Sequence, residues 1–379
     1  MKRSVLVVAG EVSGDMHAAA VVAELRRRAP ETSFWGIGGD HLRAAGMEIL
    51  HDVREMAVMG LPEVLRRYGF FRRVFAELAA EAARRRPDLV LLVDYPGFNL
   101  RFAARAKALG LRVAYFICPQ VWAWHRSRIP SMAARIDRLL VLLPFEKPLF
   151  DGTGLRADFV GHPLVDAAAA ARMEPTPDLP WCGTERVALL PGSRRQEIER
   201  ILPALLDAAA ALRARRPDAG FIVACPSDAI ARQVESLAGG ARPEGVRVVA
   251  GRTRHVLRQA RAAWVASGTA TLEAALMACP MVVVYRTSPL TWLLGRLLVR
   301  VPHIGLVNIV AGREVCPEYI QGAATPDALA DALEPLIGDT PERAAMVRGL
   351  EEAAARLGPG GAAARAAACL QEEMEHGAP

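Results

Sequence analysis

Two stretches of the chain place small residues and a charged side chain directly after an apolar run. In residues 262–276 a Ser-Gly-Thr turn separates an apolar strand from a helix-forming segment. In residues 187–198 a Gly-Ser turn leads to Arg194 at the onset of a helix. Because the N–H groups and the positive dipole end of a helix start favour anions, both stretches predict a site for a phosphate or pyrophosphate.

The same stretches lack the signatures of nucleotide hydrolysis. Neither contains a Gly-Lys-Ser/Thr sequence or a G-x-G-x-x-G pattern. Glu273 follows about one helical turn later, where its carboxylate could accept hydrogen bonds from two sugar hydroxyls. The alternative is that Ser267 and Thr269 only cap a helix and that Glu273 is solvated. The pair of loops favours a nucleotide diphosphate that is bound and not hydrolysed at its terminal phosphate.

The elements that must position these loops are apolar strands alternating with helices. We expect strands in the first half at residues 4–9, 33–37, 89–93, 112–117, 139–143 and 158–160, and in the second half at residues 187–190, 220–224, 246–249, 263–266 and 281–285. Such an order predicts parallel sheets covered on both faces. We therefore expect an α/β fold with two doubly wound, Rossmann-like domains facing each other across a cleft, where the two loops meet at the carboxyl ends of one sheet.

The expected domain boundary lies where the strand–helix rhythm weakens. Between residues 161 and 184 an alanine run and a proline-rich piece predict a linker. This gives a first domain over residues 1–165 and a second over residues 166–335. The tail, residues 336–379, is rich in Ala, Glu and Arg and is expected to be helical, with the option that it packs back on the first domain.

Composition narrows the class of protein. The chain has 379 residues, 52% of them hydrophobic and 23% charged, which excludes a disordered chain. A net charge of +6 favours anionic partners, among them phosphorylated substrates and anionic membranes. The six cysteines lack C-x-x-C spacing and are expected to be reduced, mostly buried thiols. We expect no signal peptide and no membrane span, so that any membrane contact is peripheral.

Nine blocks, in order along nearly the whole chain, closely resemble the lipid-A-disaccharide synthase family. They are residues 9–15 (AGEVSGD), 58–64 (VMGLPEV), 94–99 (DYPGFN), 119–124 (PQVWAW), 143–146 (LPFE), 160–163 (VGHP), 190–194 (LPGSR), 267–273 (SGTATLE) and 308–314 (NIVAGRE). The resemblance implies an inverting, UDP-dependent glycosyltransferase of the GT-B architecture in bacterial lipid A (lipopolysaccharide) biosynthesis. It would transfer 2,3-diacylglucosamine from its UDP derivative to 2,3-diacylglucosamine 1-phosphate, in the cytoplasm and peripherally on the inner membrane. The alternative is a nucleotide-sugar-binding protein or epimerase of similar architecture without transferase activity.

The resemblance assigns roles to the two anion loops. Ser193, Arg194, Ser267, Gly268 and Thr269 would hold the UDP diphosphate, Glu273 would bind the ribose, and Asn308 would complete the donor site. No cofactor is implied. The sequence has no Asp-x-Asp and no close cluster of histidines and carboxylates, which agrees with a site without a metal. The helix N-termini and the arginine would then stabilise the charge that develops on the leaving diphosphate.

Inverting transfer needs a base for the acceptor hydroxyl, and Asp94 is the strongest candidate. It follows the most apolar strand of the first half and matches the family position regarded as catalytic. The alternative, a helix cap, is less favoured because Pro96 and Gly97 intervene. Competing candidates on the first loop are Glu11, Asp15 and His17.

Further candidates for acceptor binding come from three blocks. On the first loop, Glu11, Ser13 and Asp15 would shape the backbone or contact the acceptor phosphate, although Asp15 could equally be a helix cap. Asn99 would orient a sugar hydroxyl or the Asp94 carboxylate. Trp122 and Arg126 would serve a sugar face and a phosphate; one such patch is a weak signal for nucleic acid, which we do not expect as a partner.

Residues 61–75 interleave apolar and basic side chains, as interfacial membrane segments do. Phe70, Phe71, Arg72 and Arg73 are the expected membrane contacts, and a core helix with a solvated basic face is the alternative. Residues 290–304 are a second candidate, for a membrane, for a subunit interface or for buried packing. If residues 290–304 form a subunit interface, the protein would be a homodimer.

Overall fold

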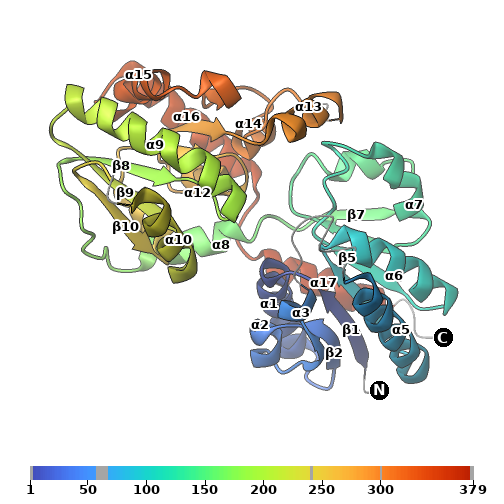
Figure 1. Cartoon of the computed structure of the whole chain (residues 1–379). Coiled ribbons are helices and arrows are strands. Elements are labelled where there is room, and N and C mark those ends of the chain that lie inside the picture. The colour runs from blue at the N-terminus through green and yellow to red at the C-terminus, as the bar shows by residue number, and fades with distance from the viewer. Residues whose placement is uncertain (1–2, 57–66, 240–241, 299–300, 376–379) are drawn as a thin grey trace. The chain divides into compact units, whose positions relative to one another are not determined.

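The structure is a computed structural model that describes residues 3–56, 67–239, 242–298 and 301–375. The chain divides into two compact units. Unit 1 comprises Met1–Pro163 together with Pro359–Pro379, and unit 2 comprises Leu164–Gly358 (Figure 1). Each unit contains one parallel sheet with helices packed around it.

The sheet of unit 1 has seven strands in the order β3-β2-β1-β4-β5-β6-β7. Their bounds are β1 Ser4–Ala9, β2 Ser33–Gly38, β3 Glu48–Asp52, β4 Leu89–Val93, β5 Val113–Phe116, β6 Arg138–Val141 and β7 Arg156–Phe159. All neighbouring pairs are parallel, with β1 in the middle between β2 and β4. Strand β4 is fully buried, which explains its unbroken apolar sequence.

Two helical layers cover this sheet. Helices α1 (Val12–Arg28) and α17 (Ala362–Glu375) pack against each other and share one apolar core with β1 and β4. Helices α5 (Tyr68–Arg85) and α6 (Pro96–Ala108) belong to the core on the other face. The shorter helices are α2 (Asp40–Ala44), α3 (Val53–Met56) and α7 (Ile129–Ala133). The alternate side chains of β1 and β4 therefore enter two different cores.

The sheet of unit 2 has six strands in the order β10-β9-β8-β11-β12-β13. Their bounds are β8 Glu185–Leu190, β9 Ala219–Cys225, β10 Val246–Ala250, β11 Ala262–Ala266, β12 Met281–Tyr285 and β13 Glu318–Ile320. Strand β8 pairs in parallel with β11, so the loops that follow these two strands leave the same edge of the sheet. The expected convergence of the two anion loops within one sheet is confirmed.

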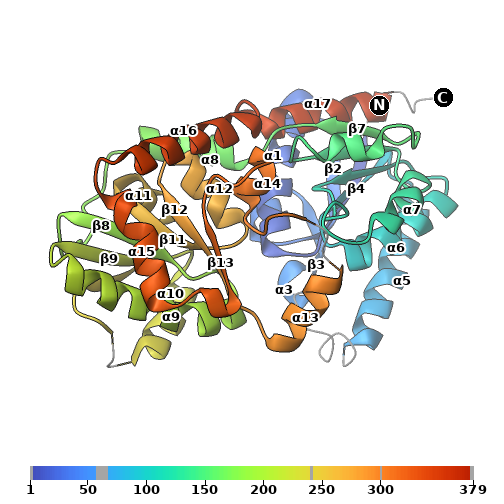
Figure 2. The ribbon, with the colours of Figure 1, turned by 90° about the horizontal axis from the view of Figure 1, so that it is seen from above.

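The helices of unit 2 form two groups. Helices α9 (Arg195–Arg215) and α15 (Pro326–Ile337) pack side by side and share a core with β8, β9 and β11 (Figure 2). Helix α10 (Asp228–Ala238) borders the same core. The others are α8 (Leu164–Met173), α11 (Thr253–Gln259), α12 (Thr269–Leu276), α13 (Pro289–Leu298), α14 (Leu306–Ala311) and α16 (Pro341–Arg356), and among these α12 packs on α8, α14 and α16.

All eleven expected strands are present, and three elements were not expected. The alanine run that we expected in a linker forms helix α8, as the high helix propensity of alanine allows. Strands β3 and β13 were not expected. Helix α5 begins at Tyr68, so residues 68–75 of the expected interfacial stretch are helical. Four of the six cysteines are buried and all six are free, as expected.

Candidate active site

Asp94 lies directly after β4 in a strained turn. Its backbone φ is +47° and that of Tyr95 is +48°, a left-handed conformation that non-glycine residues rarely adopt. Helix α6 begins two residues later, with Pro96 as its first residue. Asp94 is partly exposed, whereas β4 before it and Phe98 after it are buried. The turn therefore carries the carboxylate from the middle of the sheet to the surface of unit 1.

Two buried side chains hold the main chain of this turn. The Tyr115 hydroxyl donates to the Asp94 carbonyl oxygen at 2.5 Å, and the Asn99 amide donates to the same oxygen at 2.8 Å. Asn99 is completely buried and also donates to the carbonyl oxygens of Val93 and Val8. Asn99 thus positions the backbone of Asp94. Its amide nitrogen donates to three main-chain oxygens, and contact with a sugar hydroxyl or with the Asp94 carboxylate stays a prediction.

The first loop lies beside this turn because β1 and β4 are neighbours. Ala9 pairs with Val93, and a Cβ on Gly10 would come within 2.3 Å of the Tyr95 ring. Glycine is therefore required at position 10 for this close approach. Burial, and then the neighbouring Glu11 carboxylate, raise the pKa of the Tyr95 phenol. Glu11 and Ser13 are exposed at the start of α1 and remain available to a ligand.

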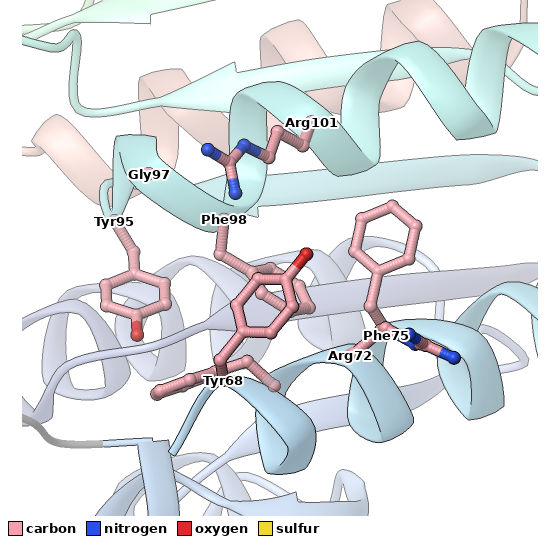
Figure 3. A pocket seen from close by; sticks show the side chains of 8 residues that line it. Tyr68, Arg72, Phe75, Tyr95, Gly97, Phe98 and Arg101 are labelled. Carbon is pink, nitrogen blue, oxygen red and sulfur yellow. The ribbon is translucent and has the colours of Figure 1, made fainter. Parts of the chain in front are cut away.

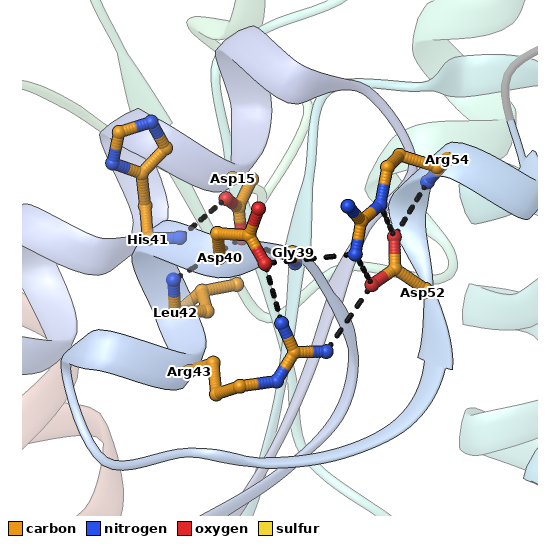
Figure 4. Close-up of polar contacts among 8 residues, drawn as sticks. All are labelled: Asp15, Gly39, Asp40, His41, Leu42, Arg43, Asp52 and Arg54. Carbon is orange, nitrogen blue, oxygen red and sulfur yellow. Dashed lines mark hydrogen bonds and ion pairs between the residues drawn. The ribbon is translucent and has the colours of Figure 1, made fainter.

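Asp15 has a different environment from Glu11 and Ser13. Its side chain is 1% exposed, and its carboxylate accepts hydrogen bonds from the backbone N–H groups of Gly39, His41 and Leu42 at 2.6, 3.0 and 3.3 Å. Figure 4 shows this carboxylate at the start of α2, with the ion pairs of Arg43 and Arg54 nearby. Asp15 therefore caps the start of a helix other than its own and ties α1 to the segment after β2.

The loop after β5 supplies one buried and one exposed candidate. Trp122 is 8% exposed and packs edge-on against Phe145, with ring centroids 5.3 Å apart, so its indole is not a free sugar platform. Glu146, next in sequence to Phe145, is 3% exposed and accepts a hydrogen bond from the Leu143 N–H at 3.0 Å. Burial raises the pKa of Glu146 to about 7. Arg126, in the loop after β5, is exposed.

The expected membrane contacts lie on the first turns of α5. Phe70 and Phe71 are partly buried, and Arg72 and Arg73 are exposed. Residues 61–66 of the same stretch lie outside the described residues. In the part of the chain that is described, no helix has both the length and the apolar character needed to cross a membrane.

In unit 2, the loop after β8 presents an arginine but uses its backbone internally. The Glu197 carboxylate accepts hydrogen bonds from the N–H groups of Ser193 and Arg194, both at 3.3 Å. Gly192 has a φ of +112°, and a Cβ there would meet the same carboxylate. The Arg194 side chain is 73% exposed and pairs loosely with Glu197 at 3.3 Å. The guanidinium of Arg194 is therefore the group this loop can offer to an anion.

The loop after β11 is arranged in the opposite way. Gly268 is the N-cap of α12, has a φ of +123° and provides no side-chain cap. Ser267 and Gly268 are partly exposed and Thr269 is exposed. The Thr271 hydroxyl donates to the Gly268 carbonyl at 2.7 Å, which fixes the turn from inside. The first N–H groups of α12 thus have no side-chain cap, as binding of a phosphate by a helix start requires.

Glu273 lies one turn further along α12, against a polar pocket of about 390 Å³ within unit 2. Its carboxylate forms an ion pair with Arg254 at 2.9 Å, and its side chain is 19% exposed. Burial raises the pKa of Glu273, and the Arg254 guanidinium opposes that rise. A second pair, His255 with Glu174 at 2.9 Å, lines the same pocket. The pocket has a size that suits a small polar ligand.

Asn308 is fully buried, and both ends of its amide are used within unit 2. The nitrogen donates to the Cys316 carbonyl and to Glu318, both at 2.8 Å. The oxygen accepts from the N–H groups of Val315 and Cys316. Asn308 therefore anchors the segment between α14 and β13. It would support a donor site through this backbone segment and would not contact the donor directly.

The polar pocket includes residues that we did not single out from the sequence, namely Pro226, Gly251, Arg252, Thr253, Arg254 and His255. They follow β9 and β10, the two strands on the far side of β8 from β11. The sequence did not reveal the order of the strands in the sheet, and this order brings these loops to the same end of the sheet as Glu273. Among the described residues, no group of three His, Cys, Asp or Glu side chains is placed to hold a metal ion.

Two α/β units, each built on one parallel sheet, define a protein of the GT-B fold class. The fold resembles the solved structure of UDP-GlcNAc 2-epimerase from Neisseria meningitidis, with a TM-score of 0.66 and 14% identity, covering 97% of this chain and 100% of that chain. It also resembles the calicheamicin glycosyltransferase CalG4, with a TM-score of 0.63 and 18% identity, covering both chains in full. These likenesses establish the fold alone.

The family follows from sequence similarity. The family model for lipid-A-disaccharide synthetase matches residues 5–369. The lipid-A-disaccharide synthase of Anaeromyxobacter sp. (strain K) is 44% identical over 366 residues, which cover 96% of this chain and 95% of that protein. The chain therefore belongs to the lipid-A-disaccharide synthase family, and it is a UDP-sugar glycosyltransferase. The predicted family and fold class are confirmed.

Proposed function

We propose that the protein transfers 2,3-diacylglucosamine from UDP-2,3-diacylglucosamine to 2,3-diacylglucosamine 1-phosphate, with inversion, giving a β-1,6-linked disaccharide 1-phosphate and UDP. The observation that carries this proposal is the 44% identity to a lipid-A-disaccharide synthase over nearly the whole chain. The residues at the strand ends supply the chemistry that the reaction needs, a carboxylate in unit 1 and anion loops in unit 2.

Asp94 is the proposed base. Its carboxylate takes the proton from the acceptor hydroxyl while that oxygen attacks the anomeric carbon of the donor. The bond from the anomeric carbon to the diphosphate oxygen breaks, and the electron pair leaves with UDP. The backbone hydrogen bonds from Tyr115 and Asn99 support this role, because they fix the main chain from which the carboxylate extends.

The two loops of unit 2 are the proposed diphosphate site. Charge develops on the departing UDP, and uncapped N–H groups of α12 together with the Arg194 guanidinium are suited to stabilise it. Ser193 and Thr269 lie on the same two loops and are exposed. We place the ribose at Glu273, in the pocket that also contains Arg254.

The experiment that tests the proposed function measures both products. The purified protein is incubated with UDP-2,3-diacylglucosamine and the 1-phosphate acceptor, and UDP and disaccharide are quantified together. Equal amounts of the two products are expected. UDP without disaccharide would exclude a transferase, and a change of the sugar configuration without UDP release would favour the epimerase alternative.

The ribose assignment has its own test. Glu273→Ala should weaken UDP binding measured by calorimetry by about tenfold, in keeping with the loss of charged hydrogen bonds. Glu273→Gln keeps the shape and one acceptor, and should lose less. Equal UDP affinity in Glu273→Ala and wild type would remove Glu273 from this role.

We also propose peripheral contact of the start of α5 with the cytoplasmic face of the inner membrane. Phe70 and Arg73 give the cleaner test, because neither lines the pocket described below. Phe70→Ser with Arg73→Glu should release the protein from anionic vesicles, and the release should be larger at low salt. Activity on solubilised substrates should stay near wild type. Unchanged, salt-insensitive vesicle binding would favour a helix that only packs on the core.

A further inference from the structure

Unit 1 contains an apolar pocket of about 500 Å³ between the start of α5 and the start of α6. Five aromatic side chains dominate its lining, which consists of Tyr68, Phe71, Arg72, Phe75, Tyr95, Gly97, Phe98 and Arg101 (Figure 3). Its volume lies in the range of pockets that hold a small organic ligand. The lining is suited to a hydrocarbon chain, because it offers wide apolar surfaces and few hydrogen-bonding groups.

The walls of the pocket are packed, and its rim is open. Phe75 contacts Phe98 and Phe102 edge-on, with ring centroids 5.5 Å apart in each pair. Phe98 is only 8% exposed, so it forms part of a fixed wall. Tyr68, in contrast, is 58% exposed. A ligand could therefore enter past Tyr68 without a rearrangement of the core.

Two arginines give the pocket a positive charge. Arg72 and Arg101 are exposed, and neither forms an ion pair within the part of the chain that the structure describes. Further along α5, by contrast, Arg84 and Arg85 are paired with Glu81 at 2.6 and 2.7 Å. Among the residues that the structure describes, no carboxylate lines the pocket. An apolar cavity with unpaired guanidinium groups matches an amphiphile that carries both a hydrocarbon chain and a phosphate.

The pocket adjoins the turn that carries the proposed base. Tyr95 directly follows Asp94, and Gly97 and Phe98 belong to the first turn of α6. A chain bound among these residues would hold its head group next to the Asp94 carboxylate. The base acts on the acceptor hydroxyl, so the acceptor is the substrate whose chain this pocket would hold. The donor has its proposed diphosphate site in unit 2.

We propose that this pocket binds one acyl chain of the phosphorylated acceptor, with Arg72 and Arg101 attracting the acceptor phosphate. This inference rests on the proposed function. It gives Phe71 and Arg72 a role in binding substrate, which separates them from Phe70 and Arg73 in the segment that we expected to contact the membrane.

Gly97 offers a direct way to fill the pocket. It lines the cavity, and a Cβ added there would meet no heavy atom within 4 Å. Gly97→Leu should therefore occupy chain space without displacing a neighbour, and Gly97→Ala should do so less. Gly69→Leu is the matched control, because a Cβ at Gly69 also meets nothing within 4 Å and Gly69 does not line the pocket.

The first measurement compares acceptors whose acyl chains differ in length. For wild type, the KM should fall by up to about fourfold for each added methylene until the pocket is full. Gly97→Leu should raise the KM for a long-chain acceptor at least tenfold and leave that for a four-carbon analogue unchanged, with kcat at saturation close to wild type. An equal rise for both acceptors, a rise in the donor KM instead, or no rise at all would overturn the proposal.

The second measurement is independent of catalysis. Calorimetry with dodecyl phosphate, below its micelle concentration, should show binding that Gly97→Leu weakens at least tenfold and Gly69→Leu does not. Arg72→Gln with Arg101→Gln should remove the preference for dodecyl phosphate over a neutral detergent with the same chain. Binding of dodecyl phosphate by a protein that makes no disaccharide would disprove the proposed function and with it the acceptor assignment. Disaccharide formation without dodecyl phosphate binding would disprove the pocket alone.

Discussion

The Asp94 turn of unit 1 and the anion loops of unit 2 leave their sheets in different ways. At Asp94 the main chain is held in a left-handed conformation by two buried side chains, Tyr115 and Asn99. At Arg194 the functional group is a side chain that is 73% exposed and only loosely paired with Glu197. One region fixes the position of a carboxylate, and the other presents a cation that can move.

This difference matches the two tasks in the proposed reaction. A base must meet one proton at one distance, so errors of position are costly. A diphosphate carries several equivalent oxygens, so a guanidinium can find a partner from a range of positions. Unit 1 therefore needs rigidity at its strand end, whereas unit 2 can use a flexible side chain together with the uncapped start of α12.

The largest effect is expected when the basic group at the rigid turn is removed. Asp94→Asn keeps the shape and the reach for hydrogen bonds but loses basicity, so kcat should fall by about 10²- to 10⁴-fold while UDP binding stays near wild type. The acidic limb of the kcat/KM profile against pH should flatten as well. If Asp94→Asn keeps most of its activity with that limb intact while Glu11→Gln is inactive, the base lies on the first loop.

The burial of Glu146 in unit 1 should make the free energy of unfolding depend on pH. The pKa of Glu146 is raised by burial to about 7, so the folded protein keeps this group neutral where the unfolded chain ionises it. The stability that this neutral group confers is therefore complete below about pH 4.5 and is lost as the pH rises toward 7. Relative to wild type, Glu146→Gln should gain roughly 3 kcal/mol over that interval and show no further change above it.

Chemical denaturation at several pH values measures this gain. The same change at Glu351, which is exposed, should leave the pH dependence as in wild type. A constant difference in the free energy of unfolding between Glu146→Gln and wild type from pH 4.5 to 8 would show that Glu146 is solvated. The contrast between a rigid strand end in unit 1 and a flexible one in unit 2 would then have less support.

A smaller effect is expected when the exposed cation of unit 2, Arg194, is removed. Arg194→Ala should cost about 1.5 to 3 kcal/mol of transition-state stabilisation, seen as a roughly 10- to 150-fold lower kcat/KM. Arg195→Ala is the matched control, because Arg195 is equally exposed but paired with Glu199 at 2.7 Å. Equal losses in the two variants would mean that the positive charge of the helix start matters and not the particular guanidinium.

The smallest effect tests the support of the turn. Tyr115→Phe removes the hydroxyl that donates to the Asp94 carbonyl but leaves the hydrogen bond from Asn99. The free energy of unfolding should fall by about 1 kcal/mol, and kcat should fall by less than tenfold with KM unchanged. A loss of kcat as large as that of Asp94→Asn would show that the phenol itself takes part in the chemistry.

The parallel sheets could be predicted because buried strands read as uninterrupted apolar runs. The exceptions are informative: β3 and β13 are edge strands with partly exposed side chains, so their sequences contain no such run. Asp94 and the two loops of unit 2 could be proposed as site residues because they directly follow strands. The sequence allowed Asp15 to be a helix cap, but it did not show that the capped helix is α2 or that Asn308 bonds internally, because these partners are defined only once the chain has folded.

The tail helix α17 gives unit 1 an unusual order of completion during synthesis. Its apolar residues close the core over β1 and β4, and Arg138, 1% exposed, is paired with Asp158 and with Glu372 of this helix. Unit 2, a continuous segment, emerges from the ribosome before α17 does. Unit 2 can therefore fold first, while the first 163 residues wait with an apolar face uncovered. A nascent chain of this protein should depend on chaperones for its earlier half more than for its later one.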